Sequence, residues 1–301
     1  MISTVVMAAV SSCTAMYCGS GYYAEQGAFH APRPATRARS TGNAAVDTGL
    51  SYRASTFSAF SGKRTRKRRK RPPGAPQRGS HILTNTGLYG AAGGRYIPDF
   101  AFSATAEDLA ARWTREFQAG IPPAGIRPAL IKLGVAPGPL SKMNSKLVSA
   151  AALTHLRTGL VIASHTGDGL AFMAQLNLLK SHGVSSAAFI WAHAQDEKDR
   201  SFYRKAAEAG AWIEFDGISS DTVDQNISLI QEVRRAGYLQ HVLISQDAVG
   251  FYVGQEHGGY CPGYTFMFSD FLPQLRKRGM AENEIRTLTV ENPRRALSQS
   301  N

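Results

Sequence analysis

The pattern of apolar and polar residues divides residues 80–301 into two kinds of segment that alternate along the chain. Short apolar segments have the length of buried strands, and the longer segments between them repeat their apolar residues at helical spacing. Strands are expected at 81–86, 127–134, 160–165, 188–193, 211–216 and 241–247. Helices are expected at 105–120, 141–158, 169–182, 197–209, 221–237, 269–278 and 281–297, the last interrupted at Pro293. This order predicts an α/β fold with a parallel sheet, either a barrel or a doubly wound sheet.

Four of the expected strands carry, at or near their C-terminal ends, a residue that can bind a metal ion. These residues are Lys132, His165, His193 and Asp247. In a (β/α)8 barrel the C-terminal ends of all strands converge on one mouth, so residues far apart in sequence can meet around one ion. The pattern therefore favours a TIM-type barrel. Such a barrel closes with eight strands, whereas six are recognisable in this sequence.

Residues 1–79 show neither helical nor strand periodicity over a useful length. They hold thirteen of the 34 basic residues and two of the 22 acidic ones, so eleven of the twelve net positive charges lie there. Eight basic residues fall within residues 63–71, and such a run of like charges favours a solvated, disordered segment. We therefore expect a low-complexity basic segment at 1–79, disordered or unrelated to the rest, and a barrel domain at 80–301.

A nucleic-acid partner for the basic run at 63–71 is an alternative interpretation, since such a cluster can contact several phosphates. No interleaved aromatic residue or recognised DNA-binding fold surrounds the run. The prediction is therefore that the protein does not act on nucleic acid.

The remaining composition is that of an ordinary globular protein, with 43% hydrophobic residues and hence enough apolar side chains for a sizeable core. Cys13, Cys18 and Cys261 provide no disulfide framework, so a reducing, cytoplasmic location is expected. No apolar run reaches the roughly 18 residues of a membrane span. The apolar start at residues 1–9 lacks the basic flank of a secretion signal, so a targeting segment has weak support.

Lys132 admits two interpretations. A lysine at the end of an apolar strand can extend its amine to solvent. Alternatively, it stays buried with a lowered pKa and reacts with carbon dioxide, giving a carbamate whose two oxygens can bridge two metal ions. His165 and His193 at neighbouring strand ends favour the second interpretation, because imidazole nitrogen is a preferred zinc ligand. Asp247 adds an oxygen ligand and a base.

These residue types predict metal-assisted hydrolysis. A divalent metal lowers the pKa of a bound water towards about 7, and the resulting hydroxide can attack a phosphoryl or carbonyl centre. Asp247 can accept the proton that is released. The sequence contains no Gly-x-Ser-x-Gly nucleophile elbow, so the mechanism needs no serine nucleophile.

Several segments of the sequence resemble the phosphotriesterase-related branch of the amidohydrolase superfamily, whose members are metal-dependent (β/α)8 hydrolases. The resemblance runs from about residue 80 to the end, nearly three quarters of the chain. The matching segments are Asn85–Gly90, Gly125–Lys132, Ala163–Gly169, Trp191–Gln195, Phe215–Gly217, Ser245–Ala248 and Val290–Pro293.

The resemblance implies a role for each strand-end residue. Lys132 would be an N6-carboxylysine bridging two divalent ions, in the first instance zinc, and His165 and His193 would bind one of them. Asp247 would bind the other ion and accept the proton. Members of this family hydrolyse organophosphate triesters, lactones and related esters, so a small-molecule ester or lactone is the expected substrate. A homodimer is left open.

The sequence departs from the family at its start. Members carry a His-x-His pair on the first strand, and no His-x-His occurs in this sequence. The six recognisable strands match strands 3–8 of the barrel, and residues 1–79 stand where strands 1–2 belong. We expect an incomplete barrel whose first strands are missing or replaced, through a frame or splicing difference in the gene. Such a centre retains one ion or none, and a catalytically impaired fragment is the alternative to an active hydrolase.

Two aromatic residues, Tyr89 and Trp191, lie next to predicted strand ends. They are expected either to line the substrate pocket, as loops at the barrel mouth do, or to pack in the core.

Overall fold

The computed structural model describes residues 83–123, 125–248 and 265–298. The predicted basic segment at 1–79, its charged run at 63–71 and the start of the first expected strand lie outside these residues. The two-part division at residue 80 therefore stays a prediction.

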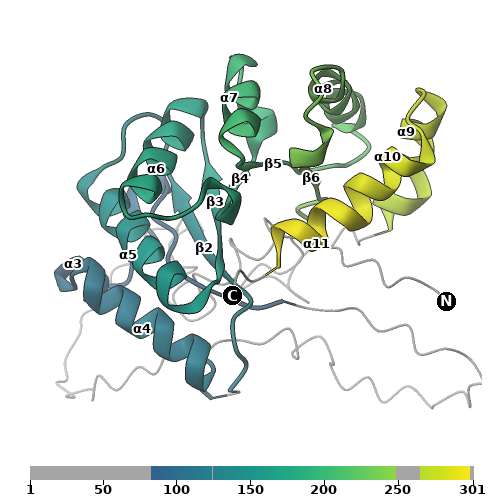
Figure 1. Cartoon of the computed structure of the whole chain (residues 1–301). Helices are drawn as coiled ribbons and strands as arrows, with labels where there is room; N and C mark the ends of the chain where they lie inside the picture. Colours follow the sequence, from purple (N-terminus) through teal and green to yellow (C-terminus); the bar gives the residue numbers. More distant parts are fainter. Residues whose placement is uncertain (1–82, 124, 249–264, 299–301) are drawn as a thin grey trace, which may run out of the picture.

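Six parallel strands form one sheet in which the order along the chain is also the order in space, from β1 to β6. Figure 1 shows the strands side by side, with the helices that follow them on one face. Within the described residues β1 and β6 do not pair with each other. This arrangement agrees with the expected six barrel strands without closure. The strands are β1 (Asn85–Thr86), β2 (Leu130–Val135), β3 (Val161–Thr166), β4 (Phe189–Ala192), β5 (Trp212–Phe215) and β6 (Val242–Ile244).

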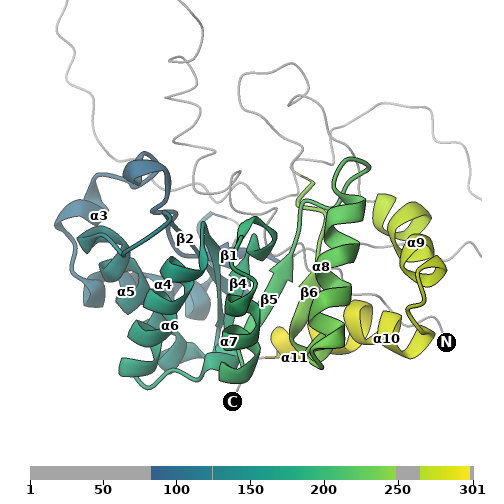
Figure 2. The same cartoon turned by 90° about the horizontal axis from the view of Figure 1, so that it is seen from above.

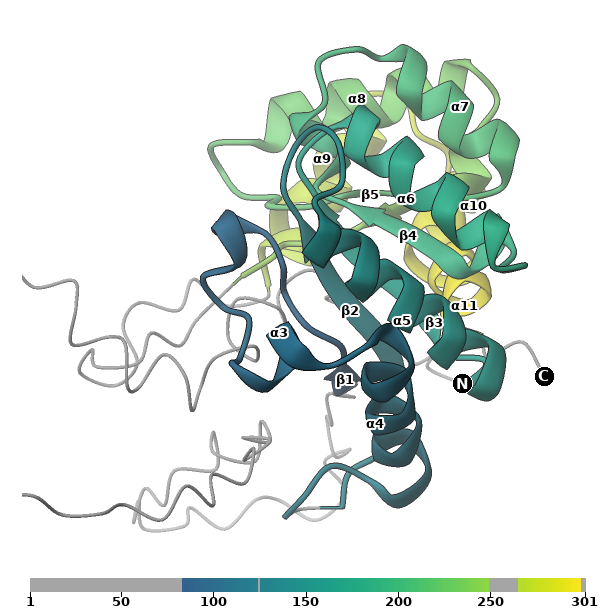
Figure 3. The same ribbon diagram turned by 90° about the vertical axis from the view of Figure 1, so that its left-hand side faces the viewer.

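The helices that connect the strands cover the outer face of the sheet, as Figures 2 and 3 show from two further directions. No helix in the described ranges is long and apolar enough to cross a membrane. The main helices are α4 (Ala106–Ala119), α5 (Lys142–Thr158), α6 (Gly169–Ser181), α7 (Ser201–Ala209) and α8 (Val223–Arg235), and a short α3 (Phe100–Ser103) precedes them.

The C-terminal region consists of several short helical segments where two longer helices were expected. The π-helical segments Met267–Phe271 and Thr287–Glu291 alternate with α9 (Leu272–Lys277), α10 (Glu282–Arg286) and α11 (Asn292–Ala296). The expected break at Pro293 is present. Proline cannot donate a backbone hydrogen bond, so it is accommodated in the first turn of α11 rather than inside a longer helix.

Helix α4 begins where the sequence indicates, at a capping box. The backbone N–H of Asp108 donates to the Thr105 hydroxyl over 3.1 Å, and the Thr105 N–H donates to the Asp108 carboxylate over 3.0 Å. Two of the amides that a helix start leaves unsatisfied are thereby paired.

Alternation along the strands separates two sets of buried residues, because successive side chains point to opposite faces of a sheet. The outward set packs against the helices. Phe172 of α6, for example, stacks on Trp191 of β4 with ring centroids 4.5 Å apart. The inward set begins with an apolar layer, against which Ala296 and Leu297 pack from the last helix of the chain. The layer consists of Leu130, Val161, Ile190, Trp212 and Leu243.

Above this apolar layer, the next inward positions of two strands are charged. Two residues further along β2 and β5 are Lys132 and Glu214, each 1% exposed. The inward position of β3 between them is the small Ala163, which pairs with Lys132 in register. The interior therefore changes from apolar to charged toward the carboxyl ends of the strands.

The loops at these carboxyl ends are tied to one another. Asp168 accepts a hydrogen bond from the backbone N–H of Ala171 over 2.7 Å and a second from the N–H of Gly138 over 2.8 Å. The same side chain thus starts α6 and holds the loop after β2 against the loop after β3.

The backbone of Gly87 packs closely against the backbone of Lys132, and substitution of Gly87 tests this contact. It has φ +114°, and a Cβ there would overlap the backbone carbonyl of Lys132. We expect Gly87→Ala to lower the free energy of unfolding by about 3 kcal/mol, from steric overlap plus backbone strain. Gly93 also has a positive φ, +68°, but open space at its Cβ position, so Gly93→Ala should cost about 1 kcal/mol. Equal costs in denaturant titrations would refute the close contact with Lys132.

Candidate metal centre

The sheet brings the predicted residues to one edge. Lys132 belongs to β2 and His165 to β3, where His165 pairs in register with Gly134. His193 directly follows β4, and Asp247 follows β6. Asp216, which follows β5, lies between these last two in the order of the strands.

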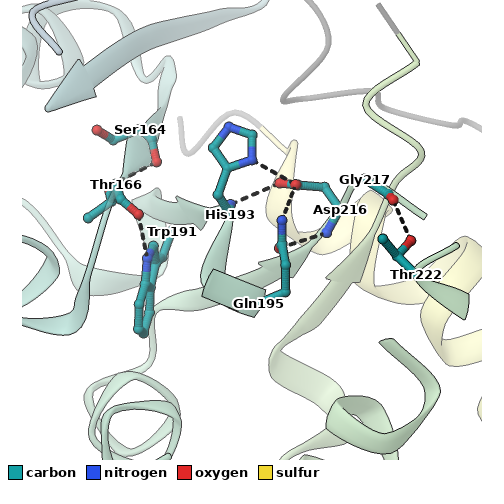
Figure 4. A network of polar contacts seen from close by, with 8 residues as sticks. All are labelled: Ser164, Thr166, Trp191, His193, Gln195, Asp216, Gly217 and Thr222. Carbon is teal, nitrogen blue, oxygen red and sulfur yellow. Dashed lines mark hydrogen bonds and ion pairs between the residues drawn. The ribbon is translucent and has the colours of Figure 1, made fainter. Parts of the chain in front are cut away.

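His193 is held by two hydrogen bonds to one carboxylate, drawn in Figure 4. Its Nδ1 lies 2.7 Å from Oδ1 of Asp216, and its backbone N–H donates to Oδ2 over 2.8 Å. Because Nδ1–H donates to a carboxylate, the lone pair of Nε2 remains for a metal ion. Burial alone would lower the pKa of His193, but the hydrogen bond and the negative charge of Asp216 outweigh it and raise the pKa.

Asp216 is 1% exposed and accepts a third hydrogen bond, from Nε2 of Gln195 over 2.6 Å. Burial would raise its pKa, but the hydrogen bonds and charge of His193 dominate and hold the pKa below its usual value. Asp216 therefore stays an anion that orients His193.

Asp247 presents a carboxylate to the same place. Its backbone has φ +42°, and its Oδ1 is buried without a hydrogen-bond partner among the residues the structure describes. Burial and the nearby charge of Asp216 raise its pKa. One ligand atom each of His193, Asp216 and Asp247 lies within 4.8 Å of the others. A buried, unsatisfied carboxylate oxygen beside an imidazole fits the donor set of a divalent cation.

His165 lies next to this group without belonging to the three residues whose ligand atoms come that close. Its ring centroid is 4.4 Å from that of His193, in an edge-on arrangement. Burial, together with the charges of His193 and Lys132, lowers the pKa of His165 to about 3. The imidazole is therefore neutral across the physiological range, the form that binds metal.

Lys132 is among the largest fully buried side chains of the described residues, at 1% exposure. Its charge acts on the pKa values of His165, His193 and Asp247, which places it at this centre. The side chain does not extend to solvent, so the alternative of an exposed strand-end lysine does not describe its position.

Sequence reasoning assigned no role to Glu214, Asp216 or Gln195. Burial first, and then the charge of Asp216, raise the pKa of Glu214 to about 8 against the attraction of Lys132. The available signal was the alternation of acidic and apolar residues in Glu214-Phe215-Asp216, which puts two carboxylates on one face of an otherwise apolar strand.

The two aromatic residues proposed for the substrate pocket lie in different surroundings. Tyr89 is partly exposed, and its ring centroid is 5.1 Å from that of His165. Trp191 is completely buried in the core under the helices. Its indole N–H donates to the Thr166 carbonyl over 3.4 Å, as Figure 4 shows. The packing alternative therefore describes the position of Trp191.

The family model that matches this chain is that of the phosphotriesterase family, over residues 74–297. Among solved structures, the crystal structure of the phosphotriesterase homology protein from Escherichia coli, complexed with phosphate in its active site, superposes with a TM-score of 0.66 at 26% identity. The superposition covers 73% of this chain and 75% of that one. This likeness supports the expected barrel fold.

Curated relatives extend the comparison. The phosphotriesterase homology protein of Escherichia coli is 27% identical over 71% of this chain and 73% of its own length. An aryldialkylphosphatase of Saccharolobus solfataricus is 23% identical, with 73% of each chain covered. A phospho-furanose lactonase of Mycoplasmopsis synoviae is 26% identical over 56% of this chain and half of its own length. The chain thus spans between half and three quarters of these relatives.

The lowered pKa of His165 predicts a pH dependence of stability in the metal-free protein. Between about pH 6.5 and 3 the unfolded chain binds a proton at this residue and the folded chain does not. The stability it contributes is therefore present above pH 6.5 and is lost as the pH falls, by up to about 1.4 kcal/mol per pH unit. Denaturant titrations at pH 7 and pH 5 should show a smaller loss for His165→Asn than for the wild type. Identical losses would contradict a buried, neutral His165.

Proposed function

Because the chain belongs to the phosphotriesterase family, we propose that it is a metal-dependent hydrolase of a small-molecule ester. The substrate classes considered are lactones, carboxylic esters and organophosphate triesters. The observation that supports this most is the convergence of His193, Asp216 and Asp247, one ligand atom of each lying within 4.8 Å of the others. One buried carboxylate oxygen of Asp247 there has no partner among the described residues.

The proposed ligands are His165, His193, Asp247 and Lys132, the last as N6-carboxylysine. When bound, a divalent cation such as zinc supplies Lewis acidity to the bond under attack and makes a water molecule more acidic. His165 is neutral because of its lowered pKa, and His193 directs Nε2 away from the Asp216 carboxylate that holds its Nδ1. The neutral His165 can donate a lone pair directly, and His193 can do so once its Nε2 has lost its proton.

Asp247 is the proposed proton acceptor. Its raised pKa, caused by burial and by Asp216, makes it a stronger base than an exposed aspartate, which suits general-base catalysis. Because Asp216 is occupied by three hydrogen bonds, it is a positioning residue in this proposal and not the base.

Tyr89 is the proposed substrate contact, because its partly exposed ring lies beside His165. Trp191 is not carried into the proposal, since it is buried in the core. The names of the relatives, an aryldialkylphosphatase and a lactonase, support phosphate triesters and lactones as the first substrates to test.

Replacing Lys132 tests the proposal. Lys132→Ala removes the bridging group, so we expect the metal content of purified protein and the hydrolysis of a lactone and an organophosphate triester to fall to background. Lys142→Ala is the matched control, because Lys142 is an exposed lysine at the start of α5 and should leave both readings unchanged.

The wild type decides between the two interpretations of this centre. Metal bound at one or two ions per chain, with turnover, supports the active hydrolase. Wild-type protein that binds no metal and turns over neither ester would establish the catalytically impaired alternative. Full turnover in Lys132→Ala would show that the lysine has no part in the reaction.

A further inference from the structure

Gln195 makes two hydrogen bonds to a single residue, Asp216. Its Nε2 donates to Oδ1 over 2.6 Å, and its Oε1 accepts from the Asp216 backbone N–H over 3.1 Å. Figure 4 shows the carboxamide lying against Asp216 in this reciprocal arrangement. A carboxamide carries a donor amino group beside an acceptor carbonyl oxygen, and each of them faces the complementary group of Asp216.

The two residues that grip Asp216 come from one short loop. His193 and Gln195 are separated by a single residue, and Asp216 lies 23 and 21 positions further along the chain. Both carboxylate oxygens of Asp216 are occupied by this loop, so the carboxylate cannot turn without breaking a bond. The loop after β4 is thereby fixed to the end of β5.

The backbone of His193 needs such support. It has φ +63° and ψ +33°, a left-handed conformation that residues with a Cβ rarely adopt. Its N–H bond to Asp216 holds this turn from one side. The next residue is held from the other side, because the Tyr203 hydroxyl donates to the Ala194 carbonyl over 2.7 Å. Strained backbone persists where its surroundings determine it in this way.

We propose that Gln195 is a positioning residue for the metal centre, acting through Asp216 to fix the orientation and the tautomer of His193. The carboxamide satisfies both groups of Asp216 and adds no charge beside the carboxylate. A glutamate would still accept from the backbone N–H, but it would lose the donor to Oδ1 and oppose the carboxylate with a second negative charge. The role at the metal rests on the proposed function; the hold on His193 does not.

The test compares Gln195→Glu with Gln225→Glu. Gln225 serves as the control glutamine. Its side chain is exposed and contacts the same loop, donating from Nε2 to the Gln195 carbonyl over 3.4 Å. The first reading is cobalt(II) affinity, from the visible absorption of titrated protein. Groups that orient metal-binding histidines are worth about ten- to a hundredfold in affinity, so Gln195→Glu should lose at least about tenfold and Gln225→Glu less than twofold.

The second reading is made on metal-free protein. The His193 side chain should give a downfield proton signal from an Nδ1–H bonded to carboxylate, assigned by its loss in His193→Gln. We expect that signal to disappear or exchange rapidly in Gln195→Glu and to persist in Gln225→Glu. Gln195→Ala, which removes both bonds without adding a charge, replaces the glutamate variant if the latter does not fold.

The outcomes separate the two proposals. Wild-type cobalt affinity and an intact Nδ1–H signal in both Gln195 variants would overturn the positioning role. A wild type that binds no cobalt would count against the proposed function, while the proton signal would still decide whether Gln195 holds His193.

Discussion

The hydrogen bonds accepted by Asp216 set the position of the groups around the candidate metal centre. Its carboxylate receives the backbone N–H and Nδ1 of His193 and the amide of Gln195 at 1% exposure. A buried anion is tolerated when donors of this kind surround it. The same bonds hold His193 in its left-handed turn. The hydrogen bonds to Asp216 therefore set the direction of His193 Nε2, although Asp216 itself need not touch the metal.

Within the sheet that the structure describes, the buried charged side chains lie toward the carboxyl ends of the strands. One lysine, Lys132, shares this region with Glu214, Asp216 and Asp247, and two of these three carboxyl groups have raised pKa values. Burial raises the pKa of Glu214 and Asp247, and the negative charge of Asp216 raises both further. The apolar layer beneath, closed by Ala296 and Leu297, supplies the rigid base.

Strand alternation explains what the sequence could and could not predict. The apolar segments predicted six strands, and Lys132, His165, His193 and Asp247 were predicted from their positions at or near the ends of those segments. In the structure β2 continues to Val135, three residues beyond Lys132. Trp191 faces the helices. His193 lies two residues later, so it would face the helices too if the strand continued. The positive φ of His193 breaks the alternation and turns its ring toward Asp216. Neither that turn nor the Gln195 contact has a signature in local sequence, because each depends on a partner more than twenty residues away.

Neighbouring strands of the described sheet position the residues of the candidate centre. With Asp216 included, each of the five strands from β2 to β6 contributes one residue, from the strand itself or from the loop after it. Each of these strands pairs with the next in parallel register. Gly87, after β1, packs its backbone against that of Lys132 and so supports the centre from the first strand of the sheet. Among the described residues, the parallel register of β2 to β6 places side by side the strand ends that carry His165, His193 and Asp247.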